Sequence, residues 1–146
     1  MSKQRTDNSL RLAYTILCDD VRLEVGNKLS LMGVFQNIAV QQLPVSLIKF
    51  AIVNHWTGAG SGNSEVRVLS PDRTQVIVAS QPTRFEVAPG GFADNVHFFV
   101  NVAFTQPGAY LVQTLVDSSL FDEFPLLIVD AQTAGAMQQG DSETVN

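Results

Sequence analysis

Apolar and polar residues alternate with a period of two along much of this chain, which is the pattern of a β-strand with one buried face. Residues 21–25 alternate in this way. In residues 11–18 the same alternation places four side chains on one face: Leu12, Tyr14, Ile16 and Cys18. In residues 96–104 it places five side chains on one face: Val96, Phe98, Val100, Val102 and Phe104. In that segment the alternation points His97 and Phe99 outward. These three segments predict half-buried strands.

Breaks at Gly, Pro and Asn divide the rest of the chain into further short strands. The continuously apolar run at residues 50–53 predicts a central strand covered on both sides. Gly26 followed by Asn27 predicts a hairpin with a type II′ turn. Near Gly33 the apolar positions change parity, which predicts a β-bulge or a sharp bend. Pro125 predicts that the last strand begins there or lies at an edge, because proline has no N–H to donate.

The whole pattern predicts eight or nine short strands with no amphipathic helix between them. We therefore expect an all-β antiparallel sandwich or barrel rather than βαβ units. Tyr110 follows the turn at residues 106–108, as in the tyrosine corner of immunoglobulin-like sandwiches, whose hydroxyl bonds to upstream backbone. This favours one immunoglobulin-like β-sandwich domain over residues 10–130. Residues 1–9 and 131–146 are predicted to be disordered tails, because they offer no apolar face to bury.

Composition supports the β-rich prediction and narrows the classes of function. Of the 146 residues, 45 are Val, Ile, Phe, Tyr, Trp or Thr, whereas Lys and Glu together number only eight. The net charge is −5, but all nine Lys and Arg lie between Lys3 and Arg84, and residues 85–146 carry only acidic charges. Because a nucleic-acid surface needs clustered cations, nucleic acid is not an expected partner.

We expect no membrane span and a cytoplasmic location. No apolar stretch approaches the ~20 residues that a spanning helix needs. Residues 1–9 are too polar for a secretory signal, and the single cysteine, Cys18, cannot form an intramolecular disulfide. Both observations agree with a reducing compartment.

Three motifs carry a resemblance to a known family. They are the segment 13–22, which contains Cys-Asp-Asp-Val-Arg at residues 18–22, the segment Lys-Leu-Ser-Leu-Met-Gly-Val-Phe at residues 28–35, and Pro-Gly-Ala-Tyr at residues 107–110. Together with Leu43-Pro44 they resemble a family of uncharacterised bacterial proteins known only as a domain of unknown function. The resemblance covers about residues 12–130 and implies a bacterial source and a single β-sandwich domain. It supplies no activity, substrate or site.

Few residues are of the kinds that carry catalysis or bind metals. Cys18 is followed by two carboxylates, Asp19 and Asp20, which raise rather than lower the pKa of a thiol, so we expect a small buried hydrophobe and not a nucleophile. His55 and His97 lie 42 residues apart and offer no short-spaced ligand pair for zinc. We find no Ser-His-Asp order with a nucleophile elbow. The sequence therefore predicts a protein that is not an enzyme and needs no cofactor or metal.

The first predicted function is a non-catalytic protein-interaction or structural module, which binds a protein partner or self-associates. Trp56 precedes a glycine-rich loop at residues 57–63, where it could anchor a partner or stack on a sugar, although it could also cap the core. An outward Phe99 beside His97 would mark a contact surface, unless a second sheet or an oligomer covers it. With Asp19 and Asp20 at the end of the first strand, these residues form the predicted interaction surface.

The alternative function is the binding of a small ligand, such as a carbohydrate, or of Ca²⁺ at loops near the strand ends. Calcium takes six to eight oxygen ligands, often carboxylates on loops. Acidic residues lie near predicted strand ends at Asp19, Asp20, Asp72, Asp117, Asp122 and Glu123. Their spacing is not that of an EF-hand, and solvated turn carboxylates are the plainer interpretation. The calcium hypothesis requires that the fold gather them at one end of the sandwich.

Overall fold

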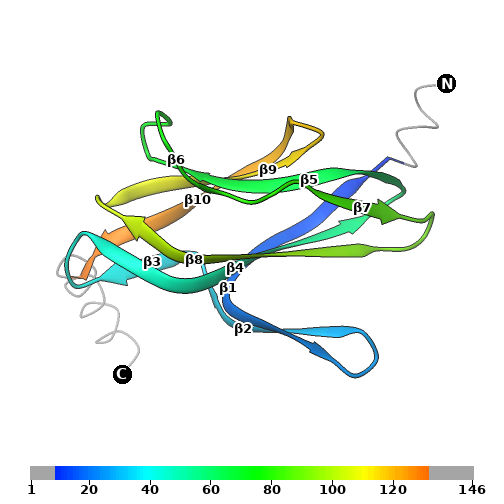
Figure 1. Ribbon diagram of the computed structural model, residues 1–146, viewed down its shortest axis with the longest axis horizontal. Helices are drawn as coiled ribbons and strands as arrows, with labels where there is room; N and C mark the ends of the chain where they lie inside the picture. Colours follow the sequence, from blue (N-terminus) through cyan, green and yellow to red (C-terminus); the bar gives the residue numbers. More distant parts are fainter. Residues whose placement is uncertain (1–8, 132–146) are drawn as a thin grey trace, which may run out of the picture.

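The computed structural model describes residues 9–131, which form a β-sandwich of two sheets (Figure 1). The strands are β1 (Arg11–Glu24), β2 (Lys28–Phe35), β3 (Asn37–Val40), β4 (Val45–Thr57), β5 (Gly60–Leu69), β6 (Val76–Ala79), β7 (Thr83–Val87), β8 (Ala93–Phe104), β9 (Gly108–Val116) and β10 (Ser119–Asp130). Sheet A has the order β2–β1–β4–β8. Sheet B has the order β3–β10–β9–β5–β6, and β7 also pairs with β5. Apart from residues 9 and 131, both predicted tails lie outside the described residues.

The all-β sandwich is confirmed, but the strand count and one pairing differ from the prediction. Residues 9–131 contain ten strands, and β3 runs parallel to β10 whereas the other pairs are antiparallel. Residues 28–40 divide at Gln36 into two strands, and β2 belongs to sheet A whereas β3 belongs to sheet B. Among the described residues, no helix is long and apolar enough to cross a membrane.

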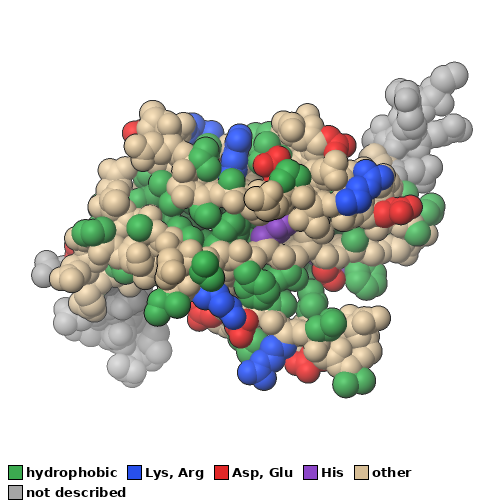
Figure 2. All heavy atoms as spheres, viewed as in Figure 1, with side chains coloured by type: hydrophobic (Ala, Val, Ile, Leu, Met, Phe, Trp, Pro, Cys, Tyr) green, Lys and Arg blue, Asp and Glu red, His purple; other side chains and the backbone are tan. Residues whose placement is uncertain are grey.

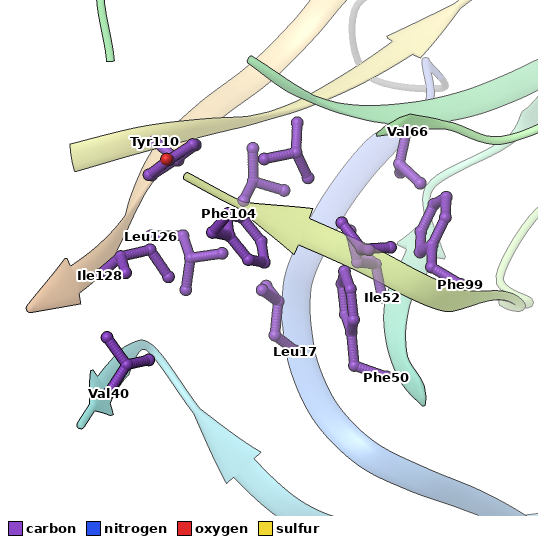
Figure 3. Close-up of a cluster of buried hydrophobic side chains, with 13 residues drawn as sticks. Leu17, Val40, Phe50, Ile52, Val66, Phe99, Phe104, Tyr110, Leu126 and Ile128 are labelled. Atoms are coloured by element: carbon purple, nitrogen blue, oxygen red, sulfur yellow. The ribbon is translucent and has the colours of Figure 1, made fainter. Parts of the chain in front are cut away.

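The main core fills the space between the two sheets (Figure 3). Its fully or almost fully buried members are Leu17, Val40, Phe50, Ile52, Val66, Val68, Phe99, Val102, Phe104, Tyr110, Val112, Leu126 and Ile128. The Tyr110 hydroxyl donates to the backbone oxygen of Gln106 at 2.7 Å, which confirms the predicted tyrosine corner. The central strand β4 is buried on both faces at residues 50–54, also as predicted.

The paired strands β4 and β8 reverse their facing near Asn101, and this overturns one prediction. His97 and Phe99 are buried between the sheets, whereas Phe98 and Val100 are exposed on the outer face of sheet A. Asn101 has a positive φ of 53°. Beyond it, Val102 and Phe104 point into the core, as predicted. The predicted outward facing of His97 and Phe99 is wrong because one alternation was continued through a residue where the backbone reverses it.

The β1–β2 hairpin extends beyond sheet A as a two-stranded arm, residues 19–31 (Figure 1). β1 pairs with β4 only as far as Cys18 and after that only with β2. At the base of the arm, Gly33 has a φ of 69° while the β1–β2 register continues unshifted, which confirms a bend rather than a bulge. At the tip, Gly26 and Asn27 have φ values of 87° and 60°. The hairpin is confirmed, but its turn is not type II′, in which only the first central residue has a positive φ.

Candidate functional site

The outer face of sheet A, which points away from sheet B, carries the side chains that the core does not use. Its first cross-strand row is Tyr14 on β1, His55 on β4 and Asp94 on β8, because Tyr14 pairs with His55 and His55 pairs with Asp94. The next two rows are apolar and contain Ile16, Val53 and Val96, followed by Cys18, Ala51 and Phe98. The face is therefore polar and aromatic at one end and apolar along its middle.

The imidazole of His55 is held on three sides. Its Nδ1 lies 2.6 Å from Oδ1 of Asp94. The ring of Tyr14 stacks on one side with centroids 4.8 Å apart and planes 6° apart, and the ring of Phe92 stacks at 5.3 Å and 28°. Partial burial, and secondarily the charge of Asp94, raise the pKa of Tyr14, so its phenol remains protonated and can donate at neutral pH.

The arm and this row enclose a cleft of about 400 Å³, which we call the aromatic cleft. Its lining residues are Tyr14, Asn27, Lys28, Leu29, Leu31, Phe92 and Asp94. Tyr14 and Phe92 come from the sheet side, and residues 27–31 come from the arm. Figure 2 shows hydrophobic side chains along the side of the sandwich that faces the arm. The cleft thus combines ring faces with a carboxylate, an amide, a phenol and an amine.

The base of the arm is fixed by apolar packing. Val21, Leu29 and Leu31 pack against Cys18, Ala51 and Val53, which are completely buried. Burial, and secondarily the charge of Asp19, raise the pKa of the Cys18 thiol. Cys18 is a free, buried cysteine, as the sequence predicted, and the thiol is kept in the protonated form that does not act as a nucleophile.

A second exposed region, which we call the outer patch, lies at the other end of the face. It comprises Asp20, Ile48, Lys49, Phe98 and Val100. The exposed fractions of its apolar side chains are 80% for Ile48, 48% for Phe98 and 65% for Val100. Nζ of Lys49 lies 5.1 Å from the centroid of the Phe98 ring and 2.9 Å from Oδ1 of Asp20. Lys49 and Val100 are also direct cross-strand neighbours.

Next to the outer patch, a groove of about 570 Å³ separates the ends of the two sheets. Residues of β2, β3 and β4 line it, and Asp19 reaches it from β1. Asp19 is exposed, and Asp20 is partly exposed and bonded both to Lys49 and to the backbone N–H of Val21. These interactions lower the pKa of Asp20. Of the five residues predicted for an interaction surface, Asp19 and Asp20 are therefore accessible.

The other three predicted surface residues are buried. Trp56 has no exposed surface: its Nε1 donates to Oδ1 of Asn95 at 2.6 Å, and its ring stacks on Phe85 at 4.7 Å. Phe99 packs against Phe50 in the main core, and His97 is buried between the sheets (Figure 3 for Phe99). The loop predicted after Trp56 is also mostly strand, since β5 begins at residue 60. These residues shape the core and do not form an exposed surface, which corrects the prediction.

The acidic residues of the calcium hypothesis do not meet. Asp72 bonds to Ser70 and Thr74 in the β5–β6 turn, Asp117 accepts from the backbone of Asn63, and Glu123 binds Arg73. Within the described residues, no group of three or more His, Cys, Asp or Glu is arranged to hold a metal ion. The calcium alternative therefore has no ligand set in this part of the chain.

The aromatic cleft is not predicted by the local sequence pattern. Tyr14 was assigned to a buried face, His55 was considered as a zinc ligand, and Phe92 and Asp94 precede the predicted strand at residues 96–104 and were given no role. The signal that would have found them is the register, which places residues 14, 55 and 94 in one row. Register depends on pairing between residues 41 and 39 positions apart in the chain, and no local pattern encodes it.

Comparison with known proteins gives a family and distant structural likenesses. A model of a family of unknown function, DUF6941, matches residues 13–129. This confirms the resemblance carried by the motifs at residues 18–22, 28–35 and 107–110. None of the curated proteins matches the chain.

Among solved structures, the chain is similar to a β-glucosidase from Erythrobacter marinus, with 10% identity over 83% of this chain and a TM-score of 0.49. It is also similar to a β-glucosidase from Listeria innocua in complex with isofagomine, with 8% identity over 83% of this chain and a TM-score of 0.47. The chain spans only 15% and 16% of the lengths of these two proteins.

Proposed function

We propose that this chain, which belongs to the family of unknown function DUF6941, is a non-catalytic interaction module that associates with a second copy of itself through the outer patch of sheet A. The observation that carries the proposal is the gathering of three exposed apolar side chains, Ile48, Phe98 and Val100, around the ion pair of Lys49 and Asp20. Contiguous exposed apolar side chains with a polar rim are typical of protein contact surfaces.

The charges of the patch favour a second copy over an unrelated partner. In a two-fold symmetric dimer the same surface meets itself, so residue i of one copy contacts residue j of the other and the reverse. The patch offers one cation and one anion side by side, about 44% and 40% exposed at Lys49 and Asp20. Rotated onto itself, it would place each Lys49 against the Asp20 of the other copy, with Phe98 and Val100 buried between the pairs.

The surroundings of His55 support a non-catalytic role. A His–Asp pair acts in catalysis when the imidazole contacts a nucleophile or a substrate proton. Among the described residues, the His55 imidazole bonds only to Asp94 and otherwise contacts the rings of Tyr14 and Phe92, so no Ser, Thr or Cys is placed as a nucleophile at its second nitrogen. A bacterial cytoplasmic location is part of the proposal, and the free thiol of Cys18 supports it because small extracellular domains usually pair their cysteines.

Sedimentation equilibrium of the full chain tests the self-association. Phe98 exposes about half of its ~200 Å² side chain, so burying the rest in a dimer contributes about 2.5 kcal/mol per copy and about 5 kcal/mol per dimer. We expect Phe98→Ala to raise the dimer dissociation constant by a thousandfold or more. Val76→Ala is the matched control, because Val76 is also about half exposed but lies on β6 of sheet B.

Two results would contradict the proposal. One is a wild-type chain that stays monomeric up to about 1 mM, where even weak association is visible. The other is a dimer that Phe98→Ala leaves intact while Val76→Ala dissociates it.

A further inference from the structure

We propose that the aromatic cleft binds a small, uncharged, polyhydroxylated ring, of which a monosaccharide is the simplest case. Its residues lie on the first row of sheet A, at Phe92 in the turn before β8 and on the arm, and none belongs to the outer patch. The inference therefore stands or falls separately from self-association.

The size of the cleft fits such a ligand. Small-molecule sites occupy roughly 300–1,000 Å³ and are lined mainly by apolar groups with a few polar ones. The aromatic cleft is open to solvent and has a volume of about 400 Å³ between two walls from different parts of the chain. One wall is the sheet with Tyr14, Phe92 and Asp94, and the other is residues 27–31 of the arm. A single sugar ring fits within this volume.

The aromatic rings supply flat apolar surfaces. Tyr14 and Phe92 are 42% and 61% exposed, although each uses one face to stack on His55. The C–H faces of a sugar ring pack on such ring surfaces, while its hydroxyls extend sideways. Leu29 and Leu31 add apolar surface on the arm side. Exposed rings at these two positions have no role in the core, which makes their placement over the cleft a feature of the site.

The polar groups match hydroxyls better than a net charge. Oδ1 of Asp94 is held by His55, and no hydrogen bond from the described residues reaches Oδ2, which can accept from two hydroxyl groups. Lys28 and the Tyr14 phenol donate, and the Asn27 amide both donates and accepts. An anion would lie against Asp94 and a cation against Lys28, so either charge meets repulsion on one wall. A neutral ring with several hydroxyls uses both walls without that penalty.

His55 acts as a positioning residue in this site. Its bond to Asp94 fixes the carboxylate, and its stacked rings set the distance between Tyr14 and Phe92. We expect His55→Ala to weaken ligand binding without direct contact to the ligand. His55→Asn should restore part of the affinity, because an amide N–H can still donate to Asp94.

The test is a titration of the ¹⁵N-labelled full chain with three probes: methyl β-D-glucopyranoside, N-acetylglucosamine and glycine. We expect at least one sugar to shift amide resonances at residues 14, 27–31 and 92–94, with a dissociation constant of about 1 mM. Phe92→Ala, at an exposed turn residue, should weaken the binding at least tenfold, and Asp94→Asn should do the same while keeping the shape of the wall. Leu120→Ala removes an exposed apolar side chain of β10 in sheet B, outside both the cleft and the outer patch, and should leave the binding unchanged.

Three outcomes would overturn the proposal. The first is the absence of shifts with either sugar up to about 50 mM, far above a millimolar dissociation constant. The second is a set of shifts that lies outside the cleft or survives Phe92→Ala and Asp94→Asn with the native spectrum retained. The third is binding of glycine in place of the sugars, which would assign the cleft to a zwitterion.

Discussion

Replacing His97 by leucine should stabilise the protein, because the buried imidazole carries a nitrogen with no hydrogen-bond partner among the described residues. His97 is 6% exposed, and its Nε2 has no hydrogen-bond partner among the described residues. An unsatisfied buried polar atom costs about 1–3 kcal/mol, and leucine fills most of the same space with apolar atoms. We expect His97→Leu to raise the free energy of unfolding by about 1–3 kcal/mol at pH 7, measured by urea denaturation.

The pH dependence of stability gives a second, independent readout of the same substitution. Burial lowers the pKa of His97 below the ordinary value of 6.5 that the unfolded chain shows. Between these two pKa values the unfolded state binds more protons, so the native chain loses stability as the pH falls through 6.5 and towards the folded value. His97→Leu removes this loss, and the two stability curves should diverge below pH 6.5. A destabilised variant, or parallel curves between pH 8 and pH 5, would refute the account of His97 as a buried neutral imidazole.

Three further substitutions test the geometry of the sheets. Gly33→Ala places a methyl group against the carboxylate of Asp19 at a φ of 69°, whereas the control Gly90→Ala has a similar φ of 77° and no atom within 4 Å of the new methyl group. We expect Gly33→Ala to lower the free energy of unfolding in urea by about 1–2 kcal/mol more than Gly90→Ala does. Equal effects of the two substitutions would contradict the close packing at the base of the arm. Trp56→Phe removes the N–H that donates to Asn95 and leaves a small void. We expect the free energy of unfolding, measured by heat or urea, to fall by about 2–4 kcal/mol. A fall of less than about 1 kcal/mol would contradict the buried hydrogen bond. Ser70→Ala removes the hydroxyl whose hydrogen bond to Asp72 contributes most to holding the pKa of that carboxyl at about 2. The pKa of Asp72 measured by NMR should therefore rise towards its ordinary value, and an unchanged pKa would contradict the hydrogen bonds of this turn.

The strand pattern was sufficient to predict the fold class, because local alternation and turn residues report directly on which positions are buried. The tyrosine corner at Tyr110 and the central strand at residues 50–53 were correct for the same reason. The bend at Gly33 was also visible, since a change of apolar parity needs a change in the backbone. Each of these features depends on residues that are close in the chain.

The candidate site could not be predicted from the sequence, because its residues are brought together by contacts between segments that are distant in the chain. The facing of Phe99 and His97 was wrong because the reversal at Asn101 is a backbone event that leaves no apolar signature. For Trp56 the sequence offered a surface anchor or a cap on the core, and its partners Asn95 on β8 and Phe85 on β7 decide for the core. The aromatic cleft exists only when the arm folds towards the row at residues 14, 55 and 94, and neither the fold of the arm nor the register is encoded locally.

A charge-exchange experiment tests the proposed self-association most directly. Asp20→Lys and Lys49→Glu each place like charges opposite one another in the symmetric dimer, so each variant alone should sediment as a monomer at a concentration where the wild type is dimeric. Mixing the two variants sets the two cations of one copy against the two anions of the other, so the account predicts that the dimer returns as a one-to-one heterodimer. If the mixture remains monomeric while the wild type dimerises, the two copies do not meet through this patch.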